Sequence, residues 1–197
     1  MISSGATTTP VPAATRLLAA AHELFYREGV HDVGIDRLIE HAGVAKMSLY
    51  RSFGSKENLI AAYLDERHRM ILHRLSDAVD REKDPRSRVL AVFDVQARWI
   101  KHRDYHGCAF TRATSEKTCG DETRAAVSRY RLAIRELLVH LADEVGANDP
   151  QQLGLQLFTL YQGSAVAHEL PQQAKALRGV RTAVETLLDA ATSAETR

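Results

Sequence analysis

The feature that most constrains the fold of this chain is a pair of short helical patterns between Gly29 and Glu57. Apolar residues recur at helical spacing from about Gly34 to His41 and again from Lys46 to about Phe53. Between the two patterns stands Ala42-Gly43-Val44, in which the glycine is free to adopt the positive φ that ends a helix. Two helices joined by such a turn form a helix-turn-helix, whose second helix lies in the major groove of DNA. The segment therefore predicts a DNA-binding unit.

The remaining sequence is also typical of helices. Only 5 prolines and 11 glycines interrupt long patterns of 3.6-residue period, which indicates an all-α protein of about nine helices. Residues 1–12 are small and polar and contain proline, so we expect a disordered leader. Asp149 and Pro150 resemble the start of a helix, with an N-cap followed by proline at the first helical position. We expect helices to end before Gly29, to cover 34–41, 46–53 and 56–80, and then 85–102, 108–118, 121–145, 150–169 and 171–192.

Composition places the chain among soluble globular proteins. Hydrophobic residues make up 45% and charged residues 26% of its 197 residues, which is enough to form a sizeable core. No apolar stretch approaches the roughly 20 residues that cross a membrane, and no signal peptide is recognisable. Two cysteines, Cys108 and Cys119, do not form a disulfide framework. We therefore expect a cytoplasmic protein with no membrane partner.

The charge balance alone does not indicate a nucleic-acid partner. The net charge is +1, and residues 1–60 carry six basic against six acidic side chains. The stretch from His41 to Lys56 is different, because it contains Lys46, Arg51 and Lys56 and no acidic residue. Phosphate attraction is screened beyond about 10 Å, so charge on the docking face matters more than the sum over a domain.

The residues from Leu17 to Leu64 resemble the N-terminal domain of the TetR/AcrR-type transcriptional regulators. Ala-Gly-Val, Leu49-Tyr50, an aromatic residue three positions later and Ser55-Lys56-Glu57 recur in that family in this order. The resemblance implies an N-terminal three-helix helix-turn-helix DNA-binding domain and a C-terminal helical domain for ligand binding and dimerisation. We expect these domains at 13–60 and 61–197, with a charged break at 81–85.

The first turn of the second motif helix carries the expected contacts to bases. A lysine there can donate to guanine and a methionine can contact a thymine methyl group. Asp36 stands where some family members place an arginine on DNA, so we expect no base contact from the first motif helix. Ala45 replaces a common capping residue, and Ser52 a common histidine. We predict base reading by Lys46, Met47 and Ser48, and phosphate contacts by Tyr50, Arg51, Ser52 and Lys56, of which Tyr50 and Lys56 match phosphate-contacting positions of the family.

The last two predicted helices carry apolar residues at alternating spacings of three and four. Such a stripe forms the seam between helices that pack at about +20°. One interpretation is that both stripes face the core of their own domain. The other, which the resemblance also implies, is a two-fold four-helix bundle in a homodimer that binds a pseudo-palindrome. The predicted dimer residues are Leu153, Leu157, Leu160, Ser164, Leu177, Val180, Val184 and Leu187.

The resemblance further implies a small-molecule effector bound among the fourth to eighth helices, whose identity the sequence leaves unknown. Ligand pockets are mostly apolar with few polar groups, which directs attention to the aromatic residues of these helices and to one arginine as a polar anchor. Each aromatic residue could equally belong to the core. The candidates are Phe93, Trp99, Phe110, Arg112, Tyr130, Phe158 and Tyr161.

The function predicted from these patterns is a ligand-responsive transcriptional repressor that binds palindromic operator DNA as a homodimer and is released by a small molecule. One alternative is a DNA-binding factor without a small-molecule ligand. Another is a metal-responsive sensor or small enzyme that uses His102, His106, Cys108 and Cys119, whose spacing fits no zinc-finger pattern. Motifs for nucleophilic, phosphate-binding or zinc-protease chemistry are absent, so we expect no enzyme activity, no cofactor and no metal.

Overall fold

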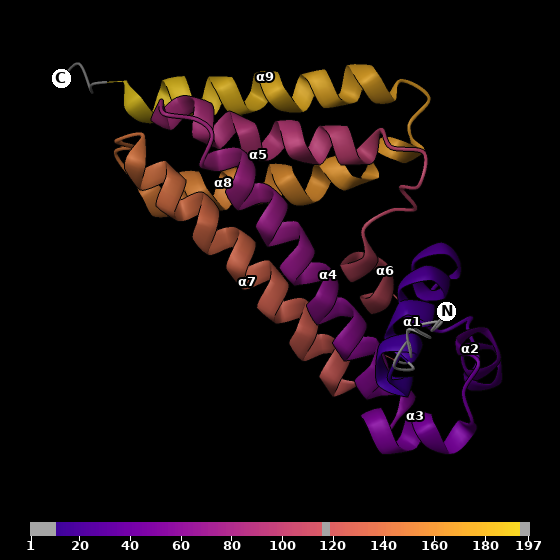
Figure 1. Cartoon of the computed structure of the whole chain (residues 1–197). Coiled ribbons are helices and arrows are strands. Elements are labelled where there is room, and N and C mark those ends of the chain that lie inside the picture. The colour runs from indigo at the N-terminus through magenta and orange to yellow at the C-terminus, as the bar shows by residue number, and fades with distance from the viewer. Residues whose placement is uncertain (1–10, 116–118, 194–197) are drawn as a thin grey trace, which may run out of the picture.

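A computed structural model describes residues 11–115 and 119–193, and within these ranges the chain forms helices and no strand (Figure 1). Residues 1–10 of the leader predicted at 1–12 and the end of the predicted helix at 116–118 lie outside the described residues. The all-α class is confirmed. The helices are α1 (Ala13–Glu28), α2 (Ile35–Ala42), α3 (Lys46–Phe53), α4 (Lys56–Val79), α5 (Pro85–Ile100), α6 (Ala109–Thr114), α7 (Asp121–Glu144), α8 (Pro150–Ser164), a 3₁₀ helix η1 (Ala165–Glu169) and α9 (Gln173–Thr192).

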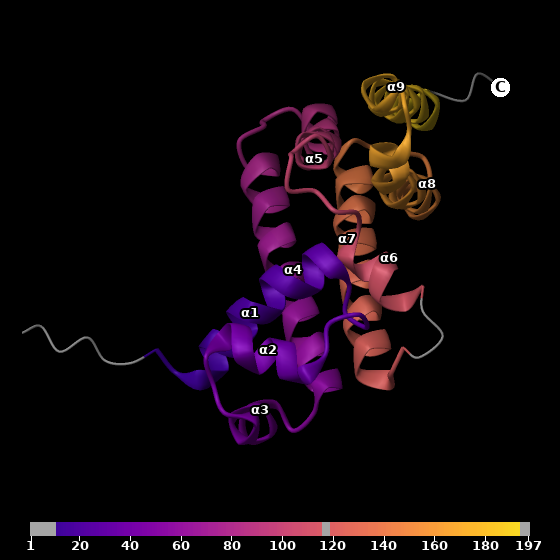
Figure 2. The same cartoon turned by 90° about the vertical axis from the view of Figure 1, so that its right-hand side faces the viewer.

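Helices α1, α2 and α3 form a small bundle at one end of the molecule (Figure 2). The apolar stripe of α1 supplies its centre, with Leu17, Ala21, Leu24 and Phe25 all buried. The helix ends where the backbone N–H of Gly29 donates to the carbonyl of Phe25 over 3.0 Å, and Gly29 takes a positive φ of 109°. The bundle therefore forms around the amphipathic face that the sequence shows.

Helix α4 connects this bundle to the rest of the molecule without a break (Figure 1). It begins at an N-cap in which the Ser55 side chain accepts a hydrogen bond from the backbone N–H of Asn58 over 3.0 Å. Its first turns bury Leu59 and Ile60 beside α1, and its last turns bury Leu75 and Val79 beside α5 and α7. The expected domain boundary after residue 60 thus falls inside a continuous helix.

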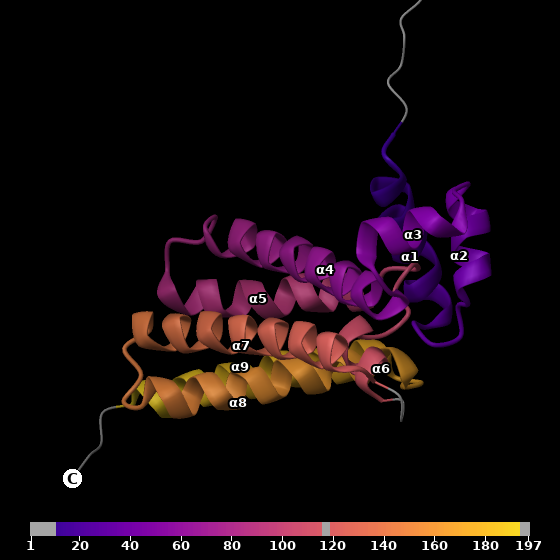
Figure 3. The same ribbon diagram turned by 90° about the horizontal axis from the view of Figure 1, so that it is seen from below.

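Among the C-terminal helices, α7 lies between α4 and α8, while α5 packs against both α4 and α9 (Figure 3). The capping signal at Asp149 is confirmed, since its side chain accepts from the backbone N–H of Gln152 over 2.9 Å. Helix α8 ends earlier than expected, at Ser164. The reason is that the carbonyl of Ala165 is engaged by side chains, 3.2 Å from the Tyr105 hydroxyl and 2.8 Å from His168 Nδ1.

A half-buried histidine of α1 makes the stability of the fold dependent on pH. The His22 ring lies edge-on to Tyr63 with 5.1 Å between centroids, and its buried Nε2 has no hydrogen-bond partner among the described residues. Burial, and then the charge of Arg67, lower the pKa of His22 below its ordinary value of 6.5. Below pH 6.5 the unfolded chain then binds more protons than the folded one. The free energy of unfolding should therefore fall as the pH drops below 6.5.

We expect His22→Gln to flatten this dependence, measured by denaturant unfolding at a series of pH values. His140→Gln is the matched control, because the His140 side chain is 65% exposed. Burial also lowers the pKa of His68, which should leave part of the slope in place. An unchanged slope in His22→Gln would contradict the assignment.

Candidate nucleic-acid interface

The turn between α2 and α3 has the geometry that its glycine predicts. Gly43 adopts φ 60° and ψ 43°, a left-handed conformation, and its N–H donates to the carbonyl of Glu40 over 3.1 Å. The next residue, Val44, donates to the carbonyl of Ile39 over 3.0 Å, so two of the carbonyls left free at the helix end are satisfied. Ala45 is extended and makes no side-chain cap, as its methyl group dictates.

Helix α3 lies at the outer edge of the bundle and is fixed there by one buried leucine (Figures 1 and 2). Leu49 is fully buried, while Met47 is 66% and Tyr50 41% exposed. The opposite face of α3 is therefore exposed, as a helix that enters a groove of DNA must be. Of the predicted contact residues, Lys46, Met47, Tyr50, Arg51 and Ser52 are exposed, and Ser48 and Lys56 are half-buried.

The two cations of α3 differ in their surroundings. Lys46 Nζ lies 3.1 Å from Asp36 Oδ1 of α2, in a pair whose side chains are 55% and 85% exposed. Such exposed pairs contribute at most about 1 kcal/mol, so a base edge or phosphate can displace the carboxylate. Arg51 makes no ion pair with any residue that the structure describes. It is therefore the more available charge on this helix.

Lys56 is held by the protein itself at the start of α4. Its Nζ donates to the carbonyl of His31 over 3.4 Å and lies 6.0 Å from the centroid of the Phe25 ring. A lysine in this position braces the loop before α2 against α1 and α4. A phosphate contact of Lys56 stays a prediction.

Glu57 joins the start of α4 to the start of α7, which local sequence patterns did not reveal. Its Oε1 accepts a hydrogen bond from the backbone N–H of Thr123 over 3.0 Å, so it acts as a cap for α7 from 66 positions away. A Cβ atom on Gly120 would lie 2.2 Å from the same oxygen. Glycine at position 120 is thus needed for the carboxylate to reach the helix end.

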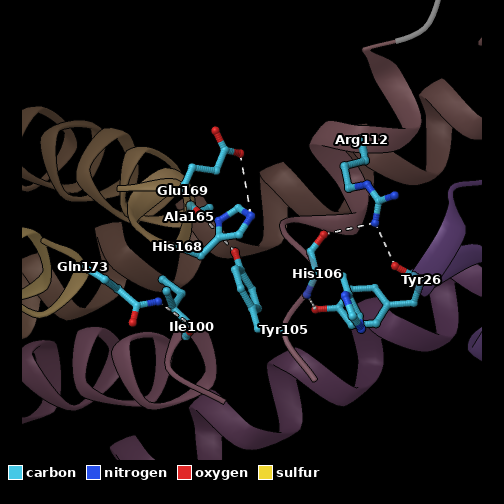
Figure 4. Close-up of polar contacts among 9 residues, drawn as sticks. All are labelled: Tyr26, Ile100, Tyr105, His106, Arg112, Ala165, His168, Glu169 and Gln173. Atoms are coloured by element: carbon cyan, nitrogen blue, oxygen red, sulfur yellow. Dashed lines mark hydrogen bonds and ion pairs between the residues drawn. The ribbon is translucent and has the colours of Figure 1, made fainter. Parts of the chain in front are cut away.

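Arg112 of α6 makes a second link between the bundle and the C-terminal helices (Figure 4). Its Nη1 donates to the carbonyl of Tyr26 over 2.8 Å and to the carbonyl of His106 over 3.1 Å. The backbone N–H of His106 donates in turn to the Tyr26 hydroxyl over 3.2 Å. Arg112 was predicted as a polar anchor in a ligand pocket, whereas here it braces the end of α1.

The aromatic residues predicted to line a pocket are divided between two places. Phe110 and Tyr130 stack face to face with 3.6 Å between centroids, and Phe93 lies edge-on to Tyr161 at 6.3 Å. These four side chains are buried, as in the core-aromatic interpretation, and Phe158 is half-buried against the same core. The Tyr130 hydroxyl donates to that of Tyr161, and burial raises the pKa of both. Trp99 lies instead at a surface groove between α4 and α5.

Most of the residues predicted to form the seam on α8 and α9 are covered within the protomer itself, and their place in a subunit interface stays a prediction. Leu153, Leu157, Ser164, Leu177 and Val184 are at most 6% exposed within the single chain. The alternating spacing identifies the inward face of each helix. The outward face carries a shallow groove of about 860 Å³ lined by Leu155, Thr159, Leu160, Ala183, Thr186 and Leu187, among others, while Val180 is half-buried.

The proposed metal ligands do not meet. Among residues 11–115 and 119–193, no group of three or more His, Cys, Asp or Glu side chains is placed to hold a metal ion. His102, His106, Cys108 and Cys119 therefore do not form such a group. Within the same ranges, no helix is long and apolar enough to pass through a bilayer.

An α2–turn–α3 unit that buries Leu38 and Leu49 and exposes a basic second helix defines a helix-turn-helix DNA-binding protein. Residues 17–63 match the family described as bacterial regulatory proteins, tetR family. The crystal structure of SCO4454, a TetR-family transcriptional regulator from Streptomyces coelicolor, is similar over 94% of this chain and 92% of that one, with a TM-score of 0.85 and 32% identity. The chain belongs to the TetR family of transcriptional regulators.

Two curated relatives are similar to part of this chain. The HTH-type transcriptional activator FasR of Mycolicibacterium smegmatis is 33% identical over 87 residues, covering 44% of this chain and 40% of FasR. The HTH-type transcriptional regulator TtgR of Pseudomonas putida is 34% identical over 107 residues, covering 49% of this chain and 50% of TtgR. The matches thus span about half the length of these relatives.

Proposed function

We propose that this chain is a repressor that binds a palindromic operator as a homodimer and is released by a small molecule. The observation that carries the proposal is the outward face of α3, where Met47 and Tyr50 are exposed beside Lys46 and Arg51. Met47 is 66% exposed, and with Tyr50 it gives the face of this short helix an apolar surface beside two cations. Such a surface can contact thymine methyl groups while the cations bind base edges and phosphates.

In this proposal the first turn of α3 contacts base edges, and the second turn contacts the phosphates of the DNA backbone. Lys46, Met47 and Ser48 lie where side chains of a recognition helix reach base edges. Tyr50, Arg51 and Ser52 follow on the next turn, and Lys56 begins α4. Residues 13–60 form the DNA-binding unit and 61–197 the regulatory unit, with α4 shared between them.

The dimer is proposed to form through the outward face of α8 and α9. One helix-turn-helix reads too few base pairs for specific binding, and two copies related by a two-fold axis read a palindrome. The groove there exposes Leu155 (45% exposed) and lies beside small residues such as Gly179 and Ala183. Small residues let a second pair of helices approach closely, which favours a four-helix contact between two copies.

Repression is the proposed sense of regulation, although one relative, FasR, is named an activator. A repressor releases its operator when the effector has a higher affinity for a conformation with poor DNA affinity. A reporter gene placed behind the operator decides the sense. Lower expression in the presence of the protein supports repression, and higher expression would show activation.

Two substitutions on α3 test the DNA-binding proposal. Lys46→Ala should relax the preference at one base position per half-site, at about 1–3 kcal/mol. Arg51→Ala should weaken binding to all sequences alike and lower the salt slope by about one unit. Selection from a random DNA library followed by salt-dependent binding titrations measures both effects.

The outcomes separate the roles of the two residues. Equal losses of Lys46→Ala on operator and random DNA would refute base reading by this lysine. A wild-type protein that selects no inverted repeat would overturn the proposed function itself.

A further inference from the structure

A groove of about 320 Å³ lies between the second half of α4 and the end of α5. Cationic and aromatic side chains surround it, and Ala78 and Val95 contribute apolar surface. At a rise of 1.5 Å per residue, Arg74 lies about 27 Å along α4 from Lys56, so the groove is remote from the DNA-facing end. The residues that define it are Arg74, Asp77, Arg81, Arg98, Trp99 and His102, and we name it the α4–α5 groove.

The arginines of this groove lack the carboxylate partners that other arginines of the chain have. Arg88 binds Glu144, and Arg129 binds Asp65 over 2.7 Å. In the described part of the chain, by contrast, no ion pair involves Arg74, Arg81 or Arg98. One carboxylate, Asp77, also lines the groove, and it lies 2.9 Å from the Nδ1 of His73. The groove thus presents three guanidinium groups without an ion-pair partner beside a single carboxylate, which leaves a net positive charge.

The centre of the groove is aromatic rather than polar. The guanidinium carbon of Arg74 lies 4.9 Å from the ring of Trp99, and the His102 ring stacks on the indole with 5.4 Å between centroids. Guanidinium groups bind carboxylates and phosphates through two parallel hydrogen bonds. A ligand that fits both features carries one anionic group on an apolar body. The volume lies at the small end of ligand pockets.

We propose that the α4–α5 groove binds a small organic anion, a carboxylate or phosphate monoester attached to an aryl or short alkyl group. This inference rests on the proposed function in one respect: the ligand of the groove is taken to be the effector that releases the operator. Trp99 lies nearly parallel to Tyr26 of α1, with 6.4 Å between ring centroids and 18° between planes. The same Tyr26 receives the hydrogen bonds of Arg112 and His106. An occupant that contacts Trp99 is therefore connected through Tyr26 to the DNA-binding unit.

The groove contains its own reporter, because Trp99 is the single tryptophan of the chain. We would titrate the full-length protein, without DNA, with benzoate, phenyl phosphate and neutral benzyl alcohol, and follow tryptophan emission. At least one of the two anions should change the tryptophan emission along a saturable binding curve. Its affinity should be lower at high salt. Benzyl alcohol should bind at least about tenfold more weakly, a difference of about 1.4 kcal/mol.

Variants locate the site. Arg98→Gln and Arg81→Gln should each raise the dissociation constant of the anion about tenfold. Arg103→Gln should leave it unchanged, because Arg103 is 90% exposed and lies outside the groove. Circular dichroism checks that all three variants are folded.

Equal affinity for benzoate, phenyl phosphate and benzyl alcohol would overturn the inference. Equal dissociation constants of the anion for Arg98→Gln and Arg103→Gln would overturn it as well. A preference for phenyl phosphate over benzoate would identify the ligand as a phosphate ester, and the reverse as a carboxylate. Because no DNA is present, failure here leaves the operator proposal standing. Failure of operator selection would likewise leave the binding site standing.

Discussion

Gly154→Ala should destabilise the protein by about 2–3 kcal/mol, toward the upper end of the cost of overpacking a core. Gly154 of α8 faces α7, and a Cβ atom there would lie 2.4 Å from Val139 Cγ2 and 2.7 Å from Val139 Cα. A side chain can rotate away from such a contact, but the Cα of a packed helix cannot. The two helices must separate, although alanine itself favours a helix by about 1 kcal/mol over glycine.

Gly163 of the same helix provides the matched control. A Cβ atom at Gly163 meets no neighbouring atom within 4 Å among the described residues, so Gly163→Ala should be neutral or slightly stabilising. Denaturant unfolding followed by circular dichroism gives both values. Similar losses in the two variants would show that the contact with Val139 is not the cause.

Leu155→Glu should dissociate the proposed dimer while the protomer stays folded. Leu155 is 45% exposed on the outward face of α8, so the free protomer tolerates a charge at this position. In the dimer the same carboxylate would be buried without a partner, at about 3–5 kcal/mol. Operator affinity should then fall by more than about a hundredfold, because each half-site is bound alone.

Leu132→Glu on α7 is the control, since Leu132 is 54% exposed on a different face. Sedimentation measures the oligomeric state, and a binding titration with the selected operator measures the affinity. A folded Leu155→Glu protein that stays dimeric would place the contact between subunits elsewhere. Loss of the dimer in Leu132→Glu alone would place it at α7.

Local signals predicted the helices well, because each acts within a few residues. The caps at Ser55 and Asp149 bind backbone N–H groups three positions ahead, and Gly43 ends α2 through its own backbone. Helix α3 runs from Lys46 to Phe53 as predicted. Where a boundary moved, as at Ser164, a side chain distant in sequence had engaged the backbone.

Contacts between distant elements could not be predicted in the same way. A stripe such as Leu153 and Leu157 shows that one face of α8 is apolar, but it does not say which helix covers that face. In the structure α7 covers it, and the smaller apolar surface around Leu155 is left outward. The partners of Glu57 and Arg112 are backbone groups, which carry no sequence signature at all.

The carboxylate of Glu57 lies at the starts of two helices. It is in the first turn of α4, and it caps the first turn of α7. Each helix start carries about half a positive charge, so one anion here is balanced by two helix dipoles. If α7 withdrew, one of these two dipoles would be lost and the charge of Glu57 would be less well balanced, beside the end of α4 that is proposed to approach DNA. The carboxylate would then repel nearby phosphates more strongly, so in this proposal a change among the regulatory helices weakens DNA binding even before α3 changes its position.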